Sequence, residues 1–307
     1  MDTKSSNRYV YMGDRLLPYD DATLHIASAA VLYGLSVYTV FPVLKTGSKL
    51  MVFRLEAHYR RLVESAKIMG IDAFPGDWTM ERFLGVVRSL IAKNKIDEDV
   101  FVRATVHVDA QAPGTRSRGL PIRLSMFAYP ATYVLPANGA KLKSSVWRRI
   151  PDSSIPARAK VNGSYVNSVL AKQDALDSGY DDCIFLDSSG HVCELSVANI
   201  FMVRDGRIIT PDTNSDLLDG INRRTVIALA EYQHIPVVER TVDLTELYIA
   251  DEVFATGTSA GVVPIVNVDA REINVGRIGP ITTKLGDLHQ KVLRGKHSQF
   301  MHWTRQL

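Results

Sequence analysis

The hydrophobic residues of the first 130 positions follow two different periods. Apolar side chains recur at spacings of three and four over residues 56–70 and 79–94, which predicts two amphipathic helices. Runs rich in β-branched and aromatic residues predict strands before, between and after these helices. These runs cover residues 9–12, 15–17, 31–44, 100–108 and 122–129. This part of the chain is therefore expected to combine helices with a sheet.

The predicted strand at 100–108 has two different faces. Valines and an alanine point one way, while Phe101, Arg103, Thr105 and His107 point the other way. An arginine and a histidine on the same face are typical of a strand that lines a cleft. A strand whose second face is simply in water would give the same pattern, so periodicity alone leaves both interpretations open.

Strands dominate after residue 139. They are predicted at 182–187, 191–195, 199–203, 207–210, 237–242, 252–256 and 262–268. Helices are expected after Ser164 and after Gly220, and at 244–250 and 281–294. Prolines and an Asn-Gly pair within 130–139 mark a connection. The sequence thus predicts an α/β protein with an N-terminal subdomain over 1–130, a connecting loop over 131–139 and a C-terminal subdomain over 140–307.

Length and composition are those of a globular protein. The 307 residues are 46% hydrophobic and 22% charged, which allows a sizeable core. No apolar run is long enough to cross a bilayer and no signal-peptide segment is visible, so a cytoplasmic location without membrane contact is expected. The net charge of +3 comes from interleaved bases and acids, which argues against nucleic-acid binding. Arginine pairs at 60–61, 148–149 and 223–224 are expected to be solvated.

Cysteine and histidine give no sign of a metal site. Cys183 and Cys193 are the only cysteines, and in a cytosolic chain they are expected to be reduced core residues rather than a disulfide. The eight histidines show no HExxH spacing, and no CxxC pair is present. No metal is therefore predicted.

One lysine has an unusual setting. Lys160 lies between an extended approach led by Pro156 and a helix led by Ser164, with small residues on both sides. This places an amine at the end of a strand or loop, beside the start of a helix. Most lysines are simply exposed, so Lys160 alone would not identify a site.

The segment around Lys160 resembles the active-site segment of the fold-type IV pyridoxal-phosphate enzymes, the class IV aminotransferases that include the branched-chain aminotransferases. Further segments resemble motifs of this family in the same order, and the resemblance extends from about Tyr9 to Thr282. These segments are 33–38, 53–62, 194–201, 218–223 and 256–260. The resemblance implies a smaller N-terminal α/β subdomain, a larger C-terminal pseudo-barrel and a homodimer whose active site includes residues of the neighbouring subunit.

The resemblance also implies how pyridoxal 5'-phosphate is held at its ring. Lys160 would bind the aldehyde as a Schiff base and later move a proton on the substrate α-carbon. Glu194 would keep the pyridine nitrogen protonated through a charge-assisted hydrogen bond. Tyr165 would bind the phenolate oxygen of the ring, and Leu218 would pack against the ring.

A phosphate dianion needs a guanidinium and several backbone N–H donors. By the resemblance, the guanidinium is that of Arg61. The N–H donors are those of Ile221 and Asn222 at the start of a helix, and of Thr258 and Ser259 in a turn.

The chain departs from the branched-chain motifs where substrate is bound. Residues 38–40 are Tyr-Thr-Val where the branched-chain enzymes have Phe-Glu-Gly, and 101–103 are Phe-Val-Arg where they have Tyr-x-Arg. At 194–199 the chain has Glu-Leu-Ser-Val-Ala-Asn in place of Glu-Gly-x-Gly-Glu-Asn. A pocket with aromatic walls is expected for the apolar side chain of the substrate. One of three arginines is expected to bind the substrate carboxylate. The wall residues are Tyr33, Tyr38, Phe101, Tyr133 and Tyr165, and the arginines are Arg103, Arg116 and Arg118.

These observations favour an aminotransferase that acts on hydrophobic or branched-chain amino acids with a 2-oxo acid as acceptor. Alternatives on the same fold are a transaminase of D-amino acids or R-amines, and an aminodeoxychorismate-type lyase. A binding protein without turnover is disfavoured, because such a protein would not need Lys160, Glu194 and Arg61 together.

Overall fold

The structure is a computed structural model that describes residues 8–111 and 113–307. The chain divides into two compact units. Unit 1 comprises Met1–Ala131, Ala159–Gly163 and Leu293–Leu307, and unit 2 comprises Thr132–Arg158 and Ser164–Val292. Each unit has its own sheet, and the mixed α/β fold class predicted from the sequence is confirmed.

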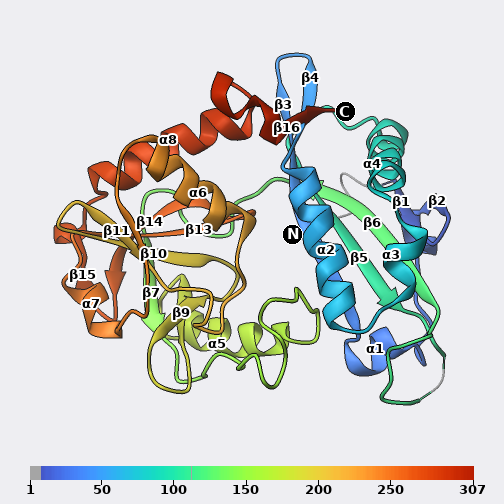
Figure 1. The fold of residues 1–307 in the computed structure, drawn as a ribbon, viewed down its shortest axis with the longest axis horizontal. Coiled ribbons are helices and arrows are strands. Elements are labelled where there is room, and N and C mark those ends of the chain that lie inside the picture. Colours follow the sequence, from blue (N-terminus) through green and yellow to red (C-terminus); the bar gives the residue numbers. More distant parts are fainter. Residues whose placement is uncertain (1–7, 112) are drawn as a thin grey trace. The chain divides into compact units, whose positions relative to one another are not determined.

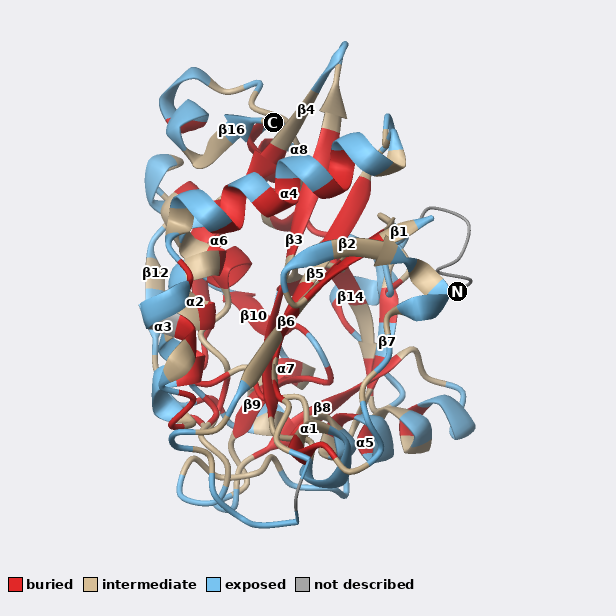
Figure 2. Ribbon diagram, turned by 90° about the vertical axis from the view of Figure 1, so that its right-hand side faces the viewer, coloured by how far each residue is buried: buried red, intermediate tan, exposed pale blue. Residues whose placement is uncertain are grey.

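Unit 1 is built on an antiparallel sheet of seven strands. In spatial order the strands are β16 (Thr304–Gln306), β4 (Lys49–Phe53), β3 (Ser36–Thr46), β5 (Val100–Val108), β6 (Ile122–Pro130), β1 (Tyr9–Met12) and β2 (Arg15–Pro18). The central strands β3 and β5 are almost entirely buried (Figure 2). They provide a rigid support for side chains at their ends.

Helices cover the sheet of unit 1. They are α1 (Ala29–Tyr33), α2 (Leu55–Ile68), α3 (Ala73–Asp77) and α4 (Met80–Asn94), with 3₁₀ turns at Tyr19–Asp21 and Ser298–Trp303. Thr79 begins α4, because its side chain accepts a hydrogen bond from the Arg82 backbone N–H at 3.2 Å. One face of α4 is buried and the other is exposed, as its apolar spacing predicts (Figure 2).

Unit 2 contains a sheet of nine strands that closes on itself. The ring runs through β10 (Asn199–Arg204), β13 (Glu252–Gly257), β14 (Gly261–Val268), β7 (Ala140–Ser144), β8 (Asp182–Leu186) and β9 (Val192–Leu195). The pairing of Asn199 with Glu194 joins β10 to β9 and closes the ring. The resulting pseudo-barrel confirms the prediction from the sequence (Figure 1). The strands β11 (Arg207–Thr210), β12 (Val237–Glu239) and β15 (Arg271–Glu272) lie outside this ring and complete the sheet.

The helices of unit 2 are α5 (Tyr165–Asp177), α6 (Ile221–Tyr232), α7 (Leu244–Tyr248) and α8 (Pro280–Leu293), with a 3₁₀ turn at Asn274–Gly276. Both cysteines are reduced and buried in this unit, as expected, and Cys183 and Cys193 pack with small side chains of α5. No helix among the described residues is long and apolar enough to span a bilayer.

Two local expectations from the sequence differ from the structure. The run 31–44 begins in a helix and not in a strand, because the Ser28 side chain accepts a bond from Val31 N–H and begins α1. The C-terminal residues do not all pack with the pseudo-barrel, since β16 pairs with β4 in unit 1. Residues 131–139 contain no helix or strand.

Candidate active site

The backbone of Lys160 is held on both sides within unit 1. Its N–H donates to the Ser65 hydroxyl at 3.0 Å, and its carbonyl accepts a hydrogen bond from Tyr38 N–H at 3.0 Å. Ser65 lies on α2 and is fully buried. The next residue, Val161, forms a bridge to Val37 of β3. Movement at Lys160 is therefore confined to its side chain, which suits an amine that must reach a fixed partner.

Two cations meet the Tyr38 ring. The Lys160 Nζ lies 4.8 Å from the ring centroid, and the guanidinium carbon of Arg103 lies 3.7 Å from it. The Arg103 Nη2 also donates to Asn162 Oδ1 at 2.5 Å, and Asn162 donates to Ser36. Cation–π contacts hold such charges without neutralising them. The structure thus brings together three residues that the sequence placed in the site, Lys160, Tyr38 and Arg103.

The second face of β5 is not in water. Phe101 and Thr105 on this face are 1% and 3% exposed. Phe101 packs against Tyr129 with ring centroids 5.9 Å apart, and Arg103 contacts the segment that carries Lys160. The interpretation of a simply wetted face is therefore wrong, because neighbouring side chains cover it.

A glycine permits the close approach of α1 to the Lys160 segment. Gly34 ends α1 with φ 63°, a left-handed conformation. A Cβ at this position would lie 2.8 Å from the Gly163 Cα, closer than any side chain allows. Glycine is required here for both reasons.

Helix α2 directs one face toward the strand β3. His58, Arg61 and Ser65 are three or four residues apart and therefore share that face. The His58 Nδ1 lies 2.9 Å from the Thr39 Oγ1, and the Arg61 Nη2 donates to the same oxygen at 3.4 Å. Complete burial and, next, the positive charge of Arg61 hold the His58 pKa well below its ordinary value. His58 therefore stays neutral and adds no second charge beside Arg61.

The other two candidate arginines lie elsewhere in unit 1. Arg116 donates to the Arg118 carbonyl, and Arg118 is 3.9 Å from Asp72 with its side chain 80% exposed. Tyr33 is 46% exposed, and its hydroxyl accepts from Gly114 N–H. Among the three arginines and within the described residues, Arg103 is the one that the structure places beside Lys160.

In unit 2, Glu194 is surrounded by donors. Its Oε1 is 3.0 Å from the Arg149 Nη2, and both side chains are about nine-tenths buried, at 8% and 11% exposed. Its Oε2 accepts from Asn199 Nδ2 at 3.2 Å and from Leu218 N–H at 3.3 Å. Charge-assisted bonds of this kind are strong and fix the orientation of a carboxylate.

Sequence reasoning missed the partners of Glu194. The arginine pairs at 148–149 and 223–224 were expected to be solvated, yet Arg149 is nearly buried and Arg223 is 2% exposed. Arg149 pairs with Glu194, and Arg223 binds Asp219, Glu239 and the Pro211 carbonyl. Glu194 and Glu239 are distant in sequence from these arginines, so no local pattern reveals those two pairs, whereas Asp219 lies four residues before Arg223 and was a visible signal. Asn199 had a visible signal, since it ends the motif that begins at Glu194.

The start of α6 offers unpaired backbone donors. Gly220 precedes the helix without a side-chain cap, and a Cβ there would overlap the Asn199 side chain. Ile221 and Asn222 begin the helix and are each 5% exposed. Asn199 also donates to the Leu218 carbonyl at 2.9 Å, so the loop before α6 is tied to β10.

A turn after β13 supplies two more donors. Gly257–Ala260 is closed by a bond from Ala260 N–H to the Gly257 carbonyl at 3.2 Å. Among the described residues, the backbone N–H groups of Ile221, Asn222, Thr258 and Ser259 have no acceptor. A helix N-terminus and a turn with open N–H groups fit a phosphate dianion.

The predicted residues Tyr133 and Tyr165 also belong to unit 2. Val134 N–H donates to the Ser259 carbonyl at 2.9 Å, which holds the connection containing Tyr133 beside the turn. The Tyr133 hydroxyl is 3.4 Å from Gln290 Nε2. Tyr165 is the first residue of α5 and is half-buried.

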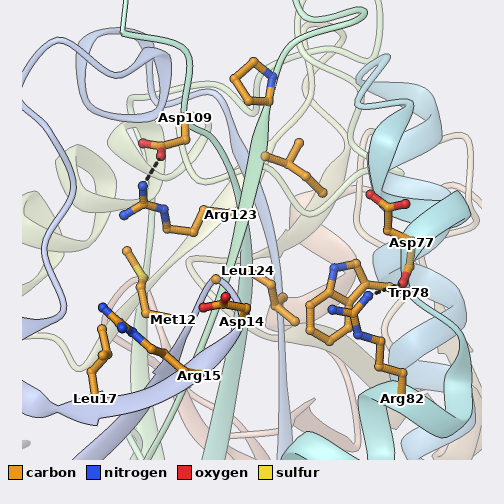
Figure 3. A pocket seen from close by; sticks show the side chains of 13 residues that line it. Met12, Asp14, Arg15, Leu17, Asp77, Trp78, Arg82, Asp109, Arg123 and Leu124 are labelled. Atoms are coloured by element: carbon orange, nitrogen blue, oxygen red, sulfur yellow. Dashed lines mark hydrogen bonds and ion pairs between the residues drawn. The ribbon is translucent and has the colours of Figure 1, made fainter.

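A separate hollow of unit 1 contains none of the predicted residues (Figure 3). This cavity of about 750 Å³ is lined by the β1–β2 hairpin, Trp78, Arg82, Asp109 and Arg123, among others. Arg123 pairs with Asp109 at 2.6 Å, and Arg82 stacks 4.1 Å above the Trp78 ring. Because these charges bind protein groups, the hollow is not a candidate active site. Within residues 8–111 and 113–307, no three His, Cys, Asp or Glu side chains gather as a metal site.

Comparisons with known proteins agree with this geometry. The family model described as amino-transferase class IV matches residues 37–268. The probable branched-chain-amino-acid aminotransferase of Aquifex aeolicus is 34% identical, over 96% of this chain and 95% of the relative. The branched-chain aminotransferase of Thermoproteus uzoniensis, solved with norvaline, has a TM-score of 0.93 and 33% identity, over 97% of this chain and 98% of that chain. A second branched-chain amino acid aminotransferase, solved in complex with N-(5'-phosphopyridoxyl)-L-glutamate, has a TM-score of 0.90 and 31% identity, over 97% of both chains.

Proposed function

The chain belongs to the class IV aminotransferase family, and from this premise we propose that it transfers amino groups between hydrophobic or branched-chain amino acids and a 2-oxo acid. The observation that carries the proposal is Lys160, whose backbone is fixed on both sides and whose amine lies beside Tyr38 and Arg103. Relatives that are named as branched-chain aminotransferases and match nearly the whole chain support the substrate class.

Pyridoxal 5'-phosphate is the cofactor of this proposal, and it supplies an aldehyde that binds amines and a ring that accepts electrons. The open N–H groups of Ile221, Asn222, Thr258 and Ser259 in unit 2 fit its phosphate. Arg61 would supply the counter-charge, as the family resemblance implies. The phosphopyridoxyl compound bound in the second of the similar structures supports this choice. Tyr165 and Leu218 would contact the ring, as the family resemblance implies.

Lys160 and Glu194 have different roles in the proposed reaction. Lys160 would bind the cofactor and act as the base and acid that moves the proton of the substrate α-carbon. Glu194, oriented by Arg149 and Asn199, would hold a proton on the pyridine nitrogen. Its negative charge would be oriented before the reaction starts, which lowers the reorganisation needed during turnover.

Arg103 would hold the substrate carboxylate, because it is the candidate arginine beside Lys160. A guanidinium matches a carboxylate with paired hydrogen bonds. Tyr33, Tyr38, Phe101 and Tyr133 would provide the aromatic surface for an apolar side chain. Arg116 and Arg118 remain alternatives for the carboxylate, and a cytoplasmic location stays a prediction from composition.

Half-reaction assays test the proposed function. Purified enzyme is mixed with L-leucine, L-isoleucine, D-alanine, an R-amine or aminodeoxychorismate. The rate at which the absorbance of the cofactor changes is then measured for each compound. We expect the branched L-amino acids to react fastest. Faster reaction of D-alanine or the R-amine would replace the proposed substrate class, and product formation from aminodeoxychorismate without amino transfer would indicate a lyase.

Arg61→Ala is expected to weaken pyridoxal-phosphate binding by about 10- to 100-fold, since hydrogen bonds to charged groups contribute about 1.5–3 kcal/mol. The order of preference among amino donors should not change, because a phosphate contact positions without selecting. Titration of the apoenzyme gives the dissociation constant. Arg60→Ala, on an exposed neighbouring residue of the same helix, is the matched control. Equal cofactor affinity in the two variants would exclude Arg61 from the phosphate site.

A homodimer is expected because unit 2 exposes an apolar patch. Val166 and Val169 on α5 are each 65% exposed, and Leu170 is 42% exposed. Val146 and Trp147, at 74% and 44%, extend this α5 patch, and Asn167 ties their loop to the helix through the Arg148 carbonyl. Exposed apolar side chains gathered on one helix and the loop tied to it are typical of a subunit interface.

Sedimentation should therefore give twice the mass of the chain, and Val169→Asp should raise the dimer dissociation constant at least about tenfold, because burying a charge is costly. Val275→Asp, at a valine outside the patch that is 73% exposed, is the control. A fully active monomer would contradict the proposal.

A further inference from the structure

The side chain of Asn222 meets a histidine from a distant part of unit 2. Asn222 is the second residue of α6 and is 5% exposed, and His289 lies on α8 and is fully buried. The His289 Nε2 is 3.3 Å from the Asn222 Oδ1. This contact fixes a side chain at the helix end where backbone N–H groups have no acceptor.

The contact with His289 shows how the amide is turned. Burial lowers the His289 pKa to about 4, so the imidazole is neutral at working pH and carries one N–H. A carboxamide oxygen can only accept, so the contact places that proton on Nε2. With Oδ1 bound by His289, the Nδ2 of Asn222 points to the other side of the amide. Among the described residues this nitrogen has no acceptor.

The position of Asn222 in α6 directs its side chain. Side chains of an α-helix lean toward its N-terminus, so the Asn222 amide lies over the open end of the helix. The open N–H groups of Ile221 and Asn222 lie at this same end. An anion bound there would meet the Nδ2 as well as the backbone donors.

We propose that the Asn222 carboxamide donates a hydrogen bond to the phosphate of the bound cofactor, and that His289 is a positioning residue that keeps the amide turned for this donation. The inference rests on the proposed function and deepens it, because it assigns a side-chain donor at the start of α6, where only backbone donors were expected. It also predicts recognition of the phosphorylated cofactor in particular.

The test compares Asn222→Ala with Asn222→Asp. The first removes the donor, and the second keeps the size but places a negative charge beside the phosphate. Titration of apoenzyme with pyridoxal phosphate should give a dissociation constant raised about tenfold by Ala and at least about tenfold further by Asp. Affinity for unphosphorylated pyridoxal should be equal in all three proteins.

Apoenzyme stability separates this effect from damage to the helix. An aspartate in the first turn of a helix is favourable, so the Tm of apo Asn222→Asp should not fall below that of apo Asn222→Ala. Equal pyridoxal-phosphate affinity of the Ala and Asp variants would overturn the inference. If the wild type takes up no pyridoxal phosphate on Lys160, the proposed function fails instead, so the two failures are distinguishable.

A double-mutant cycle tests His289. His289→Leu should raise the pyridoxal-phosphate dissociation constant several-fold in the wild type and leave it unchanged in the Asn222→Ala protein, because the histidine acts only through the amide. His289→Gln keeps a hydrogen-bond donor, so its affinity for pyridoxal phosphate should lie between those of the Leu variant and the wild type. This variant replaces His289→Leu in the cycle if the Leu variant does not fold. The same loss in both backgrounds would make His289 a packing residue and would overturn its positioning role.

Discussion

Lys160→Ala is expected to yield a protein without the yellow colour of the wild type and with transamination reduced by at least about 10³-fold, since positioned acid–base groups alone commonly contribute about 10²- to 10⁴-fold. The alanine removes both the amine that binds the cofactor and the group that moves the α-proton. The backbone bonds from Lys160 to Ser65 and Tyr38 do not involve the side chain, so the fold of unit 1 should be retained. Absorbance spectra and single-turnover assays measure the two effects.

Borohydride reduction of the wild type, followed by peptide mapping, identifies the lysine that carries the cofactor. Lys143→Ala is a suitable control, because Lys143 makes a partly exposed ion pair with Asp174 at 2.9 Å and lies outside the site. This control should keep its colour and turnover. A label on a lysine other than Lys160 would remove Lys160 from its role.

Glu194→Gln is expected to bind the cofactor but to lose turnover by on the order of a hundredfold or more, as is common when an electrostatic contact in the transition state is removed. The phosphate donors do not depend on Glu194, so retention should be close to that of the wild type. The glutamine has the size of the glutamate but brings an NH₂ group into a shell of donors. It must turn this group toward Arg149 or toward Asn199 and the Leu218 N–H, and neither side offers an acceptor there.

Glu252→Gln is the matched control for loss of a buried carboxylate. Glu252 is 5% exposed and accepts hydrogen bonds from the backbone N–H groups of Ile281 and Thr282 at the start of α8. This control should lower Tm without a large change in turnover per folded molecule. A Glu194→Gln variant within about threefold of the wild type would mean that Glu194 is not the partner of the pyridine nitrogen, since such contacts contribute far more.

The sequence by itself determined the elements and the order of the motifs. The strand Val100–Val108 and the starts of α4 and α6 follow from local signals, namely alternation, a threonine cap and a glycine before a helix. Periodicity and caps involve residues within a few positions of one another, so they can be read without knowing the fold. Motif spacing similarly located Lys160 and Glu194 as candidates.

Only the tertiary structure decided what surrounds these candidates. Ser65 meets Lys160 from 95 positions away, His289 meets Asn222 from 67 positions away, and Arg149 proved to be the buried partner of Glu194. The position of Arg103 beside Lys160, in contrast to Arg116 and Arg118, also required the structure, because all three are arginines near predicted strands or loops. Contacts between distant residues depend on how strands pair and helices pack, and a local pattern carries no information about either. The sequence therefore identified the candidate side chains. The fold determined which of them form ion pairs, hydrogen bonds or ring contacts with one another.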